Sequence, residues 1–423
     1  MEKKYNKIHI IGSQGIGLSA LAGLLSAAGA RISGSDLETG GHGAANVPLD
    51  ADLIIYSNAV PSDNPERDRA RELKIPESSY PQALGEFARG KKVIAVSGTN
   101  GKTTTTAMIG WIMEKAGFDP TVIVGSSVLD WNKNYRAGKG DWIVLEADEY
   151  KRAFLNYVPD IAVITNIALD HLDYYRDLDD IKQAFTEFIT KLKPSGILVY
   201  NLEDENTVAV SSDPSPGDGE GQRERSLIGF VHGNFKLRVP GQFNQQNAAA
   251  ASAVCRVLGI SQKTIEGALA TFRGTWRRFE RVGRLGSTEI ISDYAHHPDG
   301  VRAVLAAANE IYGGKTLAVF QPHQHNRTKK LFAQFVEAFS ASPVNDIIIS
   351  EIFDVAGREQ TADQDVSSKD LVREIKKCGK HVIYANNLQD CETMTRELAK
   401  DYNAIIIMGA GDIYKVADKL VNT

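Results

Sequence analysis

Residues 97–106 form a glycine-rich turn whose residue types could bind the phosphates of a nucleotide. The turn reads SGTNGKTTTT and follows a short apolar run, Val93–Val96, that is typical of a buried strand. A helix-like pattern begins directly after it. Glycines let backbone N–H groups approach an anion, and the first turn of a helix carries partial positive charge. The sequence therefore predicts phosphate contacts from Gly98, Thr99, Asn100, Gly101, Lys102, Thr103 and Thr104.

Two side chains of this turn have a more specific expected role. Lys102 can reach the β- and γ-phosphates, and the Thr103 hydroxyl can bind Mg²⁺. The usual phosphate-binding loop has four residues between its glycines, whereas this one has two. A turn that needs glycine for its geometry alone would not require lysine and threonine in this order at a helix start. We therefore interpret the turn as a nucleotide site of a particular subclass.

Acidic residues follow the next expected strand, Asp141–Leu145, in the run EADEY. The carboxyl ends of parallel strands are where α/β sheets bind ligands. Mg²⁺ prefers oxygen ligands, so we expect Thr103 and Glu146 to hold this ion, with Asp148 and Glu149 as open alternatives. Each acid could instead be a helix cap or a solvated side chain, but three acids in one turn favour a cation.

A histidine follows the strand expected at Ile161–Ile164, within the run TNIALDHLD. A single histidine is more often structural than functional. His171 lies between two aspartates after a strand end, which favours a metal role with a second Mg²⁺.

Polar residues also follow strands near the C-terminus. DYAHHP holds Asp293, Tyr294, His296 and His297, and of the two adjacent histidines we expect one to pack or cap a helix and the other to face a substrate. FQPHQHNRT is crowded with hydrogen-bonding groups, and its Arg327 could bind a carboxylate with two hydrogen bonds. GAGDI could be a close-packed turn with an aspartate cap or part of the same site.

A second glycine turn occurs near the N-terminus, after the expected strand Lys7–Ile11. Its glycines are Gly12, Gly15 and Gly17, in the order GxxGxG, and Asp36 follows the next expected strand. Glycine turns also occur for packing reasons alone. With Asp36, the pattern favours a ligand that contains a diphosphate.

The composition is that of an ordinary soluble protein that works in a reducing compartment. The chain has 423 residues, 43% of them apolar and 24% charged, with a net charge of −5, so nucleic acid is not an expected partner. The three cysteines show no metal-type spacing, which suits the cytoplasm. No apolar run reaches the length of a membrane span, and we expect neither a membrane partner nor a signal peptide.

The elements that must position these residues read as three α/β domains. Residues 1–89 are expected to form a Rossmann-like domain, residues 90–272 a central domain with a parallel sheet and the phosphate-binding turn, and residues 273–423 a third, Rossmann-like domain. Residues 211–225 are expected to be an exposed loop. Further expected elements are helices at 18–28, 180–192 and 244–258 and strands at 31–33, 51–57, 197–200, 290–292, 316–320, 346–350, 381–384 and 404–408.

These landmarks, in this order over the whole chain, resemble the Mur ligases of peptidoglycan synthesis. GTNGKTTTT is similar to their ATP loop, and EADE and TNIALDHLD resemble their magnesium-binding strand ends. PGQFNQQNAAAA resembles their nucleotide-binding helix start. The runs WRRF, DYAHHP, FQPHQHNRT and GAGDI are most similar to the first ligase of that pathway.

The resemblance implies an ATP-dependent ligase that joins L-alanine to the lactyl carboxylate of UDP-N-acetylmuramate through an acyl phosphate. ATP and Mg²⁺ are the implied cofactors, and the implied assembly is a monomer or a weak homodimer. Lys102, Glu146, His171, Arg278 and Asp293 are the implied catalytic residues, with Thr103, Glu146 and His171 around the metal.

The same resemblance assigns binding residues. Asn244 and Asn247 match positions near the adenine, Arg278 an arginine near the ATP phosphates, and Asp293 an acid near the ribose. The residues implied for the other substrates are Gly12, Gly15, Gly17, Ser35 and Asp36 for the UDP-sugar, and Asn166, Tyr294, His296 and Arg327 for the reacting groups.

Departures from the family pattern leave alternatives open. Asn100 stands where the first ligase usually has histidine, and Gln324 where it typically has arginine. The segment from Asp36 to Val47 is also short. One alternative is a murein peptide ligase that attaches a recycled tripeptide to the same sugar nucleotide. Another alternative is a non-catalytic nucleotide-binding protein. A further one is a folate-type glutamate ligase, and the DYAHHP run and the Rossmann-like start argue against this last alternative.

Overall fold

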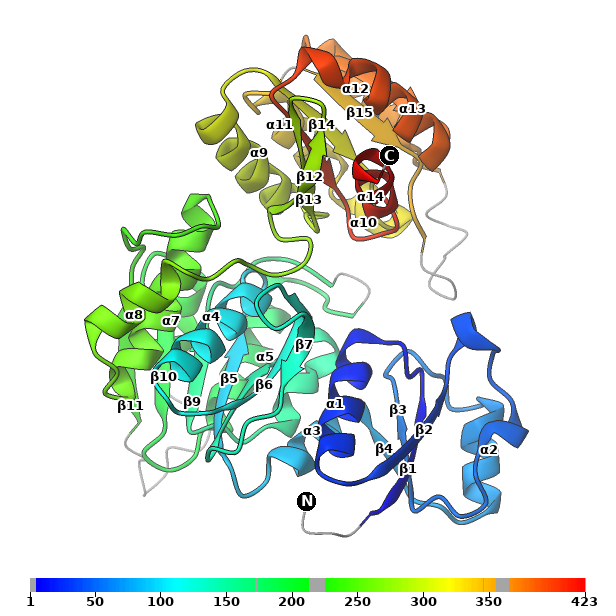
Figure 1. The fold of residues 1–423 in the computed structure, drawn as a ribbon, viewed down its shortest axis with the longest axis vertical. Coiled ribbons are helices and arrows are strands. Elements are labelled where there is room, and N and C mark those ends of the chain that lie inside the picture. Colours follow the sequence, from blue (N-terminus) through cyan, green and yellow to red (C-terminus); the bar gives the residue numbers. More distant parts are fainter. Residues whose placement is uncertain (1–4, 172–173, 213–224, 345, 355–364, 423) are drawn as a thin grey trace. The chain divides into compact units, whose positions relative to one another are not determined.

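The computed structural model describes residues 5–171, 174–212, 225–344, 346–354 and 365–422. Its strands form three sheets, each drawn from one stretch of the chain and each with helices on its faces (Figure 1). The α/β class and the three-sheet plan expected from the sequence are therefore confirmed.

The first sheet has four parallel strands in the order β2-β1-β3-β4. Apolar side chains of β1 and β3 are buried on both faces, as in other parallel sheets with helical layers. Its strands are β1 (Lys7–Ile11), β2 (Arg31–Ser35), β3 (Leu53–Tyr56) and β4 (Glu77–Ser79), and its helices are α1 (Ile16–Ala27), α2 (Pro65–Glu72) and α3 (Tyr80–Ala88), with short 3₁₀ turns η1 (Leu37–Thr39) and η2 (Ala44–Asn46).

The second sheet has seven strands in the order β11-β10-β9-β5-β8-β6-β7, and only the β6–β7 pair is antiparallel. Strand β5 lies near its centre, so the phosphate-binding turn starts from a buried strand end. The strands are β5 (Lys92–Ser97), β6 (Thr121–Val128), β7 (Lys133–Arg136), β8 (Trp142–Glu146), β9 (Ile161–Ile164), β10 (Ile197–Asn201) and β11 (Ser226–Phe230), and the helices are α4 (Lys102–Lys115), η3 (Tyr150–Asn156), α5 (Leu178–Thr190), α6 (Glu205–Ser212), α7 (Gln242–Val257) and α8 (Gln262–Leu269).

The third sheet has six strands in the order β12-β13-β17-β14-β15-β16, with β12 and β13 antiparallel and the others parallel. Its strands are β12 (Glu280–Leu285), β13 (Thr288–Asp293), β14 (Thr316–Phe320), β15 (Asp346–Ser350), β16 (His381–Ala385) and β17 (Ala404–Met408). Its helices are α9 (Pro298–Tyr312), α10 (His325–Lys330), α11 (Phe332–Ser340), α12 (Ser368–Lys377), α13 (Leu388–Leu398) and α14 (Tyr414–Val421), with a 3₁₀ turn η5 (Ala399–Asp401).

The chain separates into two compact units. One comprises residues 1–238 and 246–273 and contains the first and second sheets, and the other comprises residues 239–245 and 274–423. In the first unit the side chain of Tyr135 on β7 packs on Gly23 of α1, and Asn134 donates a hydrogen bond to the carbonyl of Ile16. The boundaries expected at residues 89/90 and 272/273 stay a prediction.

Most of the elements expected from the sequence are present. The segment 211–225 is only partly described: residues 211–212 end α6, and residues 213–224 lie outside the described residues. Among the described residues, no helix is both long enough and apolar enough to pass through a lipid bilayer.

Candidate active site

The turn at residues 98–101 closes on the strand beside it. Backbone N–H groups of Thr99 and Asn100 donate to the carbonyl and side chain of Asn166, each at 2.9 Å, and the Asn166 amide donates back to Asn100. Gly98 has φ +131°, and a Cβ there would lie 2.1 Å from the Thr165 hydroxyl oxygen. The turn is therefore rigid, and its glycine is needed for close packing as well as for backbone geometry.

Lys102, the first residue of α4, points back over this turn. Its ammonium donates to the carbonyl of Gly98 at 2.6 Å and pairs with Glu149 at 2.9 Å. Burial opposes the charge, but the carboxylates of Glu149, Asp148 and Glu146 outweigh it and raise the pKa of Lys102. The residue therefore supplies a fixed positive charge at the phosphate-binding turn.

Thr103, in the first turn of α4, lies beside Glu146 at the end of β8. The threonine hydroxyl donates to a Glu146 carboxylate oxygen at 3.0 Å, and the other oxygen accepts from the backbone of Gly125 at 2.6 Å. Two ligands at right angles around an octahedral Mg²⁺, each about 2.1 Å from the ion, are about 3 Å apart. The spacing of this pair suits a magnesium ion.

His171 lies beside Glu149 and Asp148. Its Nε2 is 3.7 Å from Glu149, and one potential ligand atom from each of Asp148, Glu149 and His171 lies within 4.8 Å of the others. The His171 ring also packs on Tyr150, with ring centroids 4.7 Å apart. The structure thus groups His171 with the second glutamate of EADEY, and it pairs the first glutamate with Thr103.

The N-terminal glycine turn is held by β2. Backbone N–H groups of Gly12 and Ser13 donate to the carbonyl of Ser35 at 2.9 and 3.0 Å, and Gly15 donates to Gly12. The Asp36 carboxylate accepts from the backbone of Gln14 and caps η1. The fold therefore brings Gly12, Gly15, Ser35 and Asp36 to one edge of the first sheet.

The Ser35 hydroxyl belongs to a buried network. It donates to Glu66 on α2 at 2.6 Å, and His9 makes a 2.9 Å hydrogen bond to the same carboxylate. Glu66 is fully buried and also accepts from the backbone of Gly43 and the side chain of Asn46. This network fixes the segment that follows Asp36.

In the second unit, Asp293 ends β13 and is buried. Its two carboxylate oxygens accept from the backbone of Phe279 and Ala295, each at 2.7 Å. Burial raises the pKa of Asp293, and the nearby Arg278 opposes the rise. The Arg278 guanidinium lies 4.9 Å from the ring centre of Tyr294. The fold therefore brings Arg278, Asp293 and Tyr294 together.

One of the two adjacent histidines caps a helix, as expected, and the substrate role of the other stays a prediction. His297 is buried and caps α9 by accepting from the backbone of Asp299. His296 is partly exposed and packs edge-on against His323, whose Nδ1 lies 3.3 Å from Arg327. His296, His323 and Arg327 thus form one polar group at the ends of β13 and β14.

The two asparagines of the α7 start lie in different units. Asn247 in the first unit accepts a hydrogen bond from Thr105 at 3.2 Å, and a Cβ on Gly101 would lie 2.3 Å from its side-chain oxygen. Asn244, in the second unit, donates to the carbonyl of Pro240. Asn247 therefore packs directly on the phosphate-binding turn.

Arg277 is a buried residue that the sequence did not single out. Its guanidinium lies against the rings of Trp276, Tyr294 and Tyr414 and donates to the carbonyl of Gly409 in the GAGDI turn. Burial lowers the pKa of Arg277. The one sequence signal that could have singled out Arg277 was the run WRRF. Its two arginines are adjacent in the chain, so their side chains face different surroundings.

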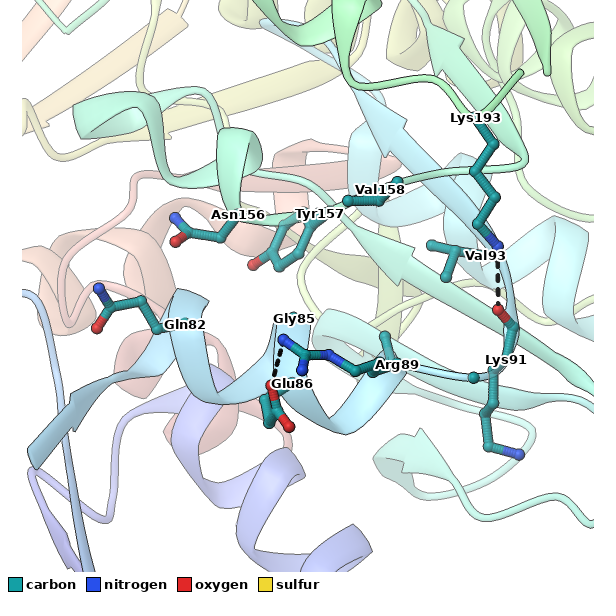
Figure 2. A pocket seen from close by; sticks show the side chains of 12 residues that line it. Gln82, Gly85, Glu86, Arg89, Lys91, Val93, Asn156, Tyr157, Val158 and Lys193 are labelled. Carbon is teal, nitrogen blue, oxygen red and sulfur yellow. Dashed lines mark hydrogen bonds and ion pairs between the residues drawn. The ribbon is translucent and has the colours of Figure 1, made fainter. Parts of the chain in front are cut away.

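A cavity of about 540 Å³ lies in the first unit where β5 begins, at the edge opposite the phosphate-binding turn (Figure 2). Two of its cations pair with acids, Lys193 with Asp160 at 2.7 Å and Arg89 with Glu86 at 2.7 Å, and Lys91 donates to the carbonyl of Gly140 at 3.2 Å. The cavity is therefore separate from the site described above.

Fold and site together define an α/β protein with a short glycine turn after a central strand and acids at the end of the neighbouring strand. Three domain descriptions of one family match the chain: "Mur ligase family, catalytic domain" at residues 7–92, "Mur ligase middle domain" at 96–215 and "Mur ligase, glutamate ligase domain" at 277–411. The chain belongs to the Mur ligase family.

Relatives in this family align over nearly the full chain. A protein of Desulfitobacterium hafniense named UDP-N-acetylmuramate–L-alanine ligase is 38% identical and covers 98% of this chain and 99% of its own. One of the same name from Caldanaerobacter subterraneus is 37% identical over 99% and 98%. The crystal structure of the UDP-N-acetylmuramate–alanine ligase MurC from Thermotoga maritima has a TM-score of 0.79 and 28% identity, covering 98% of each chain.

Proposed function

We propose that this protein catalyses the ATP-dependent joining of L-alanine to the lactyl carboxylate of UDP-N-acetylmuramate. The observation that carries the proposal is the full-length likeness to ligases of that name, 38% identical over 98% of this chain. The rigid turn with Lys102 beside it, and the acids at the next strand end, provide the parts that phosphoryl transfer requires.

In the first step, a lactyl carboxylate oxygen attacks the γ-phosphorus of ATP, the bond to the bridging oxygen breaks, and ADP leaves. The product is an acyl phosphate. The Lys102 ammonium, with the backbone N–H groups of the turn and helix start that do not bond to Asn166, would hold the β- and γ-phosphates, because this positive charge is in place before the reaction begins.

The magnesium ligands belong to the same proposal. Thr103 and Glu146 would hold one ion, and their 3.0 Å oxygen separation suits it. His171 would hold a second ion with Glu149 and Asp148, the acids beside it. Bound Mg²⁺ would neutralise charge on the phosphates.

In the second step, the amine of L-alanine attacks the acyl carbon and inorganic phosphate leaves as the amide bond forms. We assign Arg327 to the carboxylate of the amino acid, with Tyr294 and His296 beside the amine. Arg278 and Asp293 would contact the ATP phosphates and ribose, and Asn244 and Asn247 the adenine. Asn166 would hold the phosphate-binding turn next to the reacting groups.

The UDP-sugar is assigned to the first sheet. Gly12, Gly15 and Gly17 would contact its diphosphate, and Ser35 and Asp36 would shape the pocket beside it. A reaction that consumes ATP and a nucleotide sugar is expected in the cytoplasm. Sedimentation would measure whether the protein is a monomer or a weak dimer.

The test is phosphate release from ATP, Mg²⁺ and UDP-N-acetylmuramate with a panel of co-substrates. L-Alanine is expected to stimulate release most strongly, with glycine and L-serine as near analogues. The tripeptide L-alanyl-γ-D-glutamyl-meso-diaminopimelate tests the recycling reaction, because Gln324 leaves this choice of co-substrate open. Release that depends on the tripeptide and not on alanine would overturn the proposal, as would ATP binding without turnover in any arm.

A further inference from the structure

Tyr80, the first residue of α3, lies directly on the N-terminal glycine turn. A Cβ placed on Gly17 would be 2.7 Å from Cζ of Tyr80 and 2.8 Å from its hydroxyl oxygen. The ring thus occupies the space that a side chain at position 17 would need. Tyr80 is sixty-three residues further along the chain than this turn, so only the fold brings them together.

The carboxylates of Glu146 and Asp148 are near enough to act on the hydroxyl of Tyr80. Burial raises the pKa of Tyr80, and these two carboxylates add to the rise. A tyrosine hydroxyl, with an ordinary pKa of about 10, keeps its proton near neutral pH, so it can donate a hydrogen bond.

This donor has no protein acceptor: among the described residues, no hydrogen bond of the Tyr80 hydroxyl is found. It is not sealed in the core either, since Tyr80 is only partly buried. A neutral donor therefore lies at a glycine turn suited to a diphosphate.

We propose that Tyr80 contacts the sugar nucleotide, its hydroxyl donating a hydrogen bond to a diphosphate oxygen at the Gly17 turn. The inference rests on the proposed function, because it takes UDP-N-acetylmuramate as the ligand of the first sheet. It adds a residue to that site.

A purely structural role for Tyr80 would have a different signature. Packing against Gly17 requires the ring and not the hydroxyl, so Tyr80→Phe removes the proposed contact and keeps the packing. Tyr135→Phe is the matched control, because the Tyr135 ring covers Gly23 on the same helix in the same manner, with its Cζ 2.3 Å from a Cβ placed there.

The experiment is calorimetric titration of UDP-N-acetylmuramate into full-length wild type, Tyr80→Phe and Tyr135→Phe, each with Mg²⁺ and a non-hydrolysable ATP analogue. Loss of a hydrogen bond to a charged group is expected to weaken binding about 10-fold or more in Tyr80→Phe. Tyr135→Phe is expected to bind like wild type. In turnover assays the KM for UDP-N-acetylmuramate should rise by the same factor, while the KM for ATP stays unchanged.

The possible results separate the two proposals. If wild type binds UDP-N-acetylmuramate and Tyr80→Phe binds it equally well, the role of Tyr80 is overturned. The proposed function then still stands. An equal rise in the KM for ATP would also overturn it, since the hydroxyl would then act through the acids. Absence of heat from wild type with this sugar nucleotide overturns the proposed function itself, and the Tyr80 contact with it.

Discussion

Replacing Glu66 by alanine is expected to loosen the first sheet more than any other single change in α2. Glu66 is fully buried, and its carboxylate accepts hydrogen bonds from Ser35 at 2.6 Å and Asn46 at 2.8 Å, and His9 lies 2.9 Å away. The backbone of Gly43 is a fourth partner at 3.0 Å. One side chain thus joins β1, β2, α2 and the segment after Asp36.

The free-energy cost of Glu66→Ala follows from the hydrogen-bond donors that lose their acceptor. Alanine removes an acceptor from the buried side chains of Ser35 and His9, from the half-buried backbone N–H of Gly43 and from the exposed side chain of Asn46. Breaking such a buried polar cluster from one side costs about 3–5 kcal/mol. A loss of about 3 kcal/mol raises the population of the locally opened state by roughly 100-fold.

The pH dependence has a defined sign. Burial works against the Glu66 charge, but the hydrogen bonds from Ser35, His9 and Asn46 outweigh it and hold the pKa of the carboxyl group below its ordinary value of 4.5. A lowered folded-state pKa contributes stability that is present above pH 4.5 and is lost as the pH falls through the lower, folded value. Glu66→Ala should therefore remove this acid-sensitive part of the stability.

The assay is hydrogen–deuterium exchange of peptides that cover β1 and β2, because a chain with several domains need not unfold in one step. These peptides are expected to exchange about 100-fold faster in Glu66→Ala, with peptides of the third sheet unchanged. Glu72→Ala is the control, since Glu72 lies on the same helix with its side chain 66% exposed and paired only with Arg69. Equal exchange in the two variants would refute the reasoning.

Three further changes act on the phosphate-binding turn. Lys102→Met should lower kcat by about 10²–10³-fold through loss of a fixed positive charge, whereas Lys115→Met at the exposed end of the same helix should have no effect on phosphate release. Thr103→Val should raise the Mg²⁺ concentration needed for half-maximal activity about tenfold, and an unchanged requirement would exclude this hydroxyl as a ligand. Gly101→Ala should weaken ATP binding about 10-fold or more in calorimetry, because its Cβ would lie 2.3 Å from a neighbouring amide oxygen; Gly117→Ala, at a similar φ of +83° with nothing within 4 Å, should bind ATP like wild type.

Strands with buried apolar runs were predictable from the sequence. The expected strands Ile161–Ile164, Thr316–Phe320, Asp346–Ser350 and Ala404–Met408 have the same bounds in the structure. Strands buried on both faces must be apolar throughout, so they are visible in the sequence. Strand β7 (Lys133–Arg136) was not predicted, because an edge strand can be polar and still pair.

The sequence by itself determined the glycine turn between a buried strand and a helix, the acids at the next strand end and the family. These features are local: a glycine turn and the helix that follows it are adjacent in the chain, and their order is enough to specify the geometry. The expected capping role of one histidine in DYAHHP is local too, and the cap falls to His297.

Only the tertiary structure decided which side chains become partners across long stretches of chain. Glu149 pairs with Lys102 from 47 residues away and lies beside His171, and neither spacing nor composition distinguishes it from Glu146. The burial of Glu66 and the position of Tyr80 on Gly17 are decided in the same way. A pairing of this kind depends on the packing of whole strands and helices, which a one-dimensional pattern does not record.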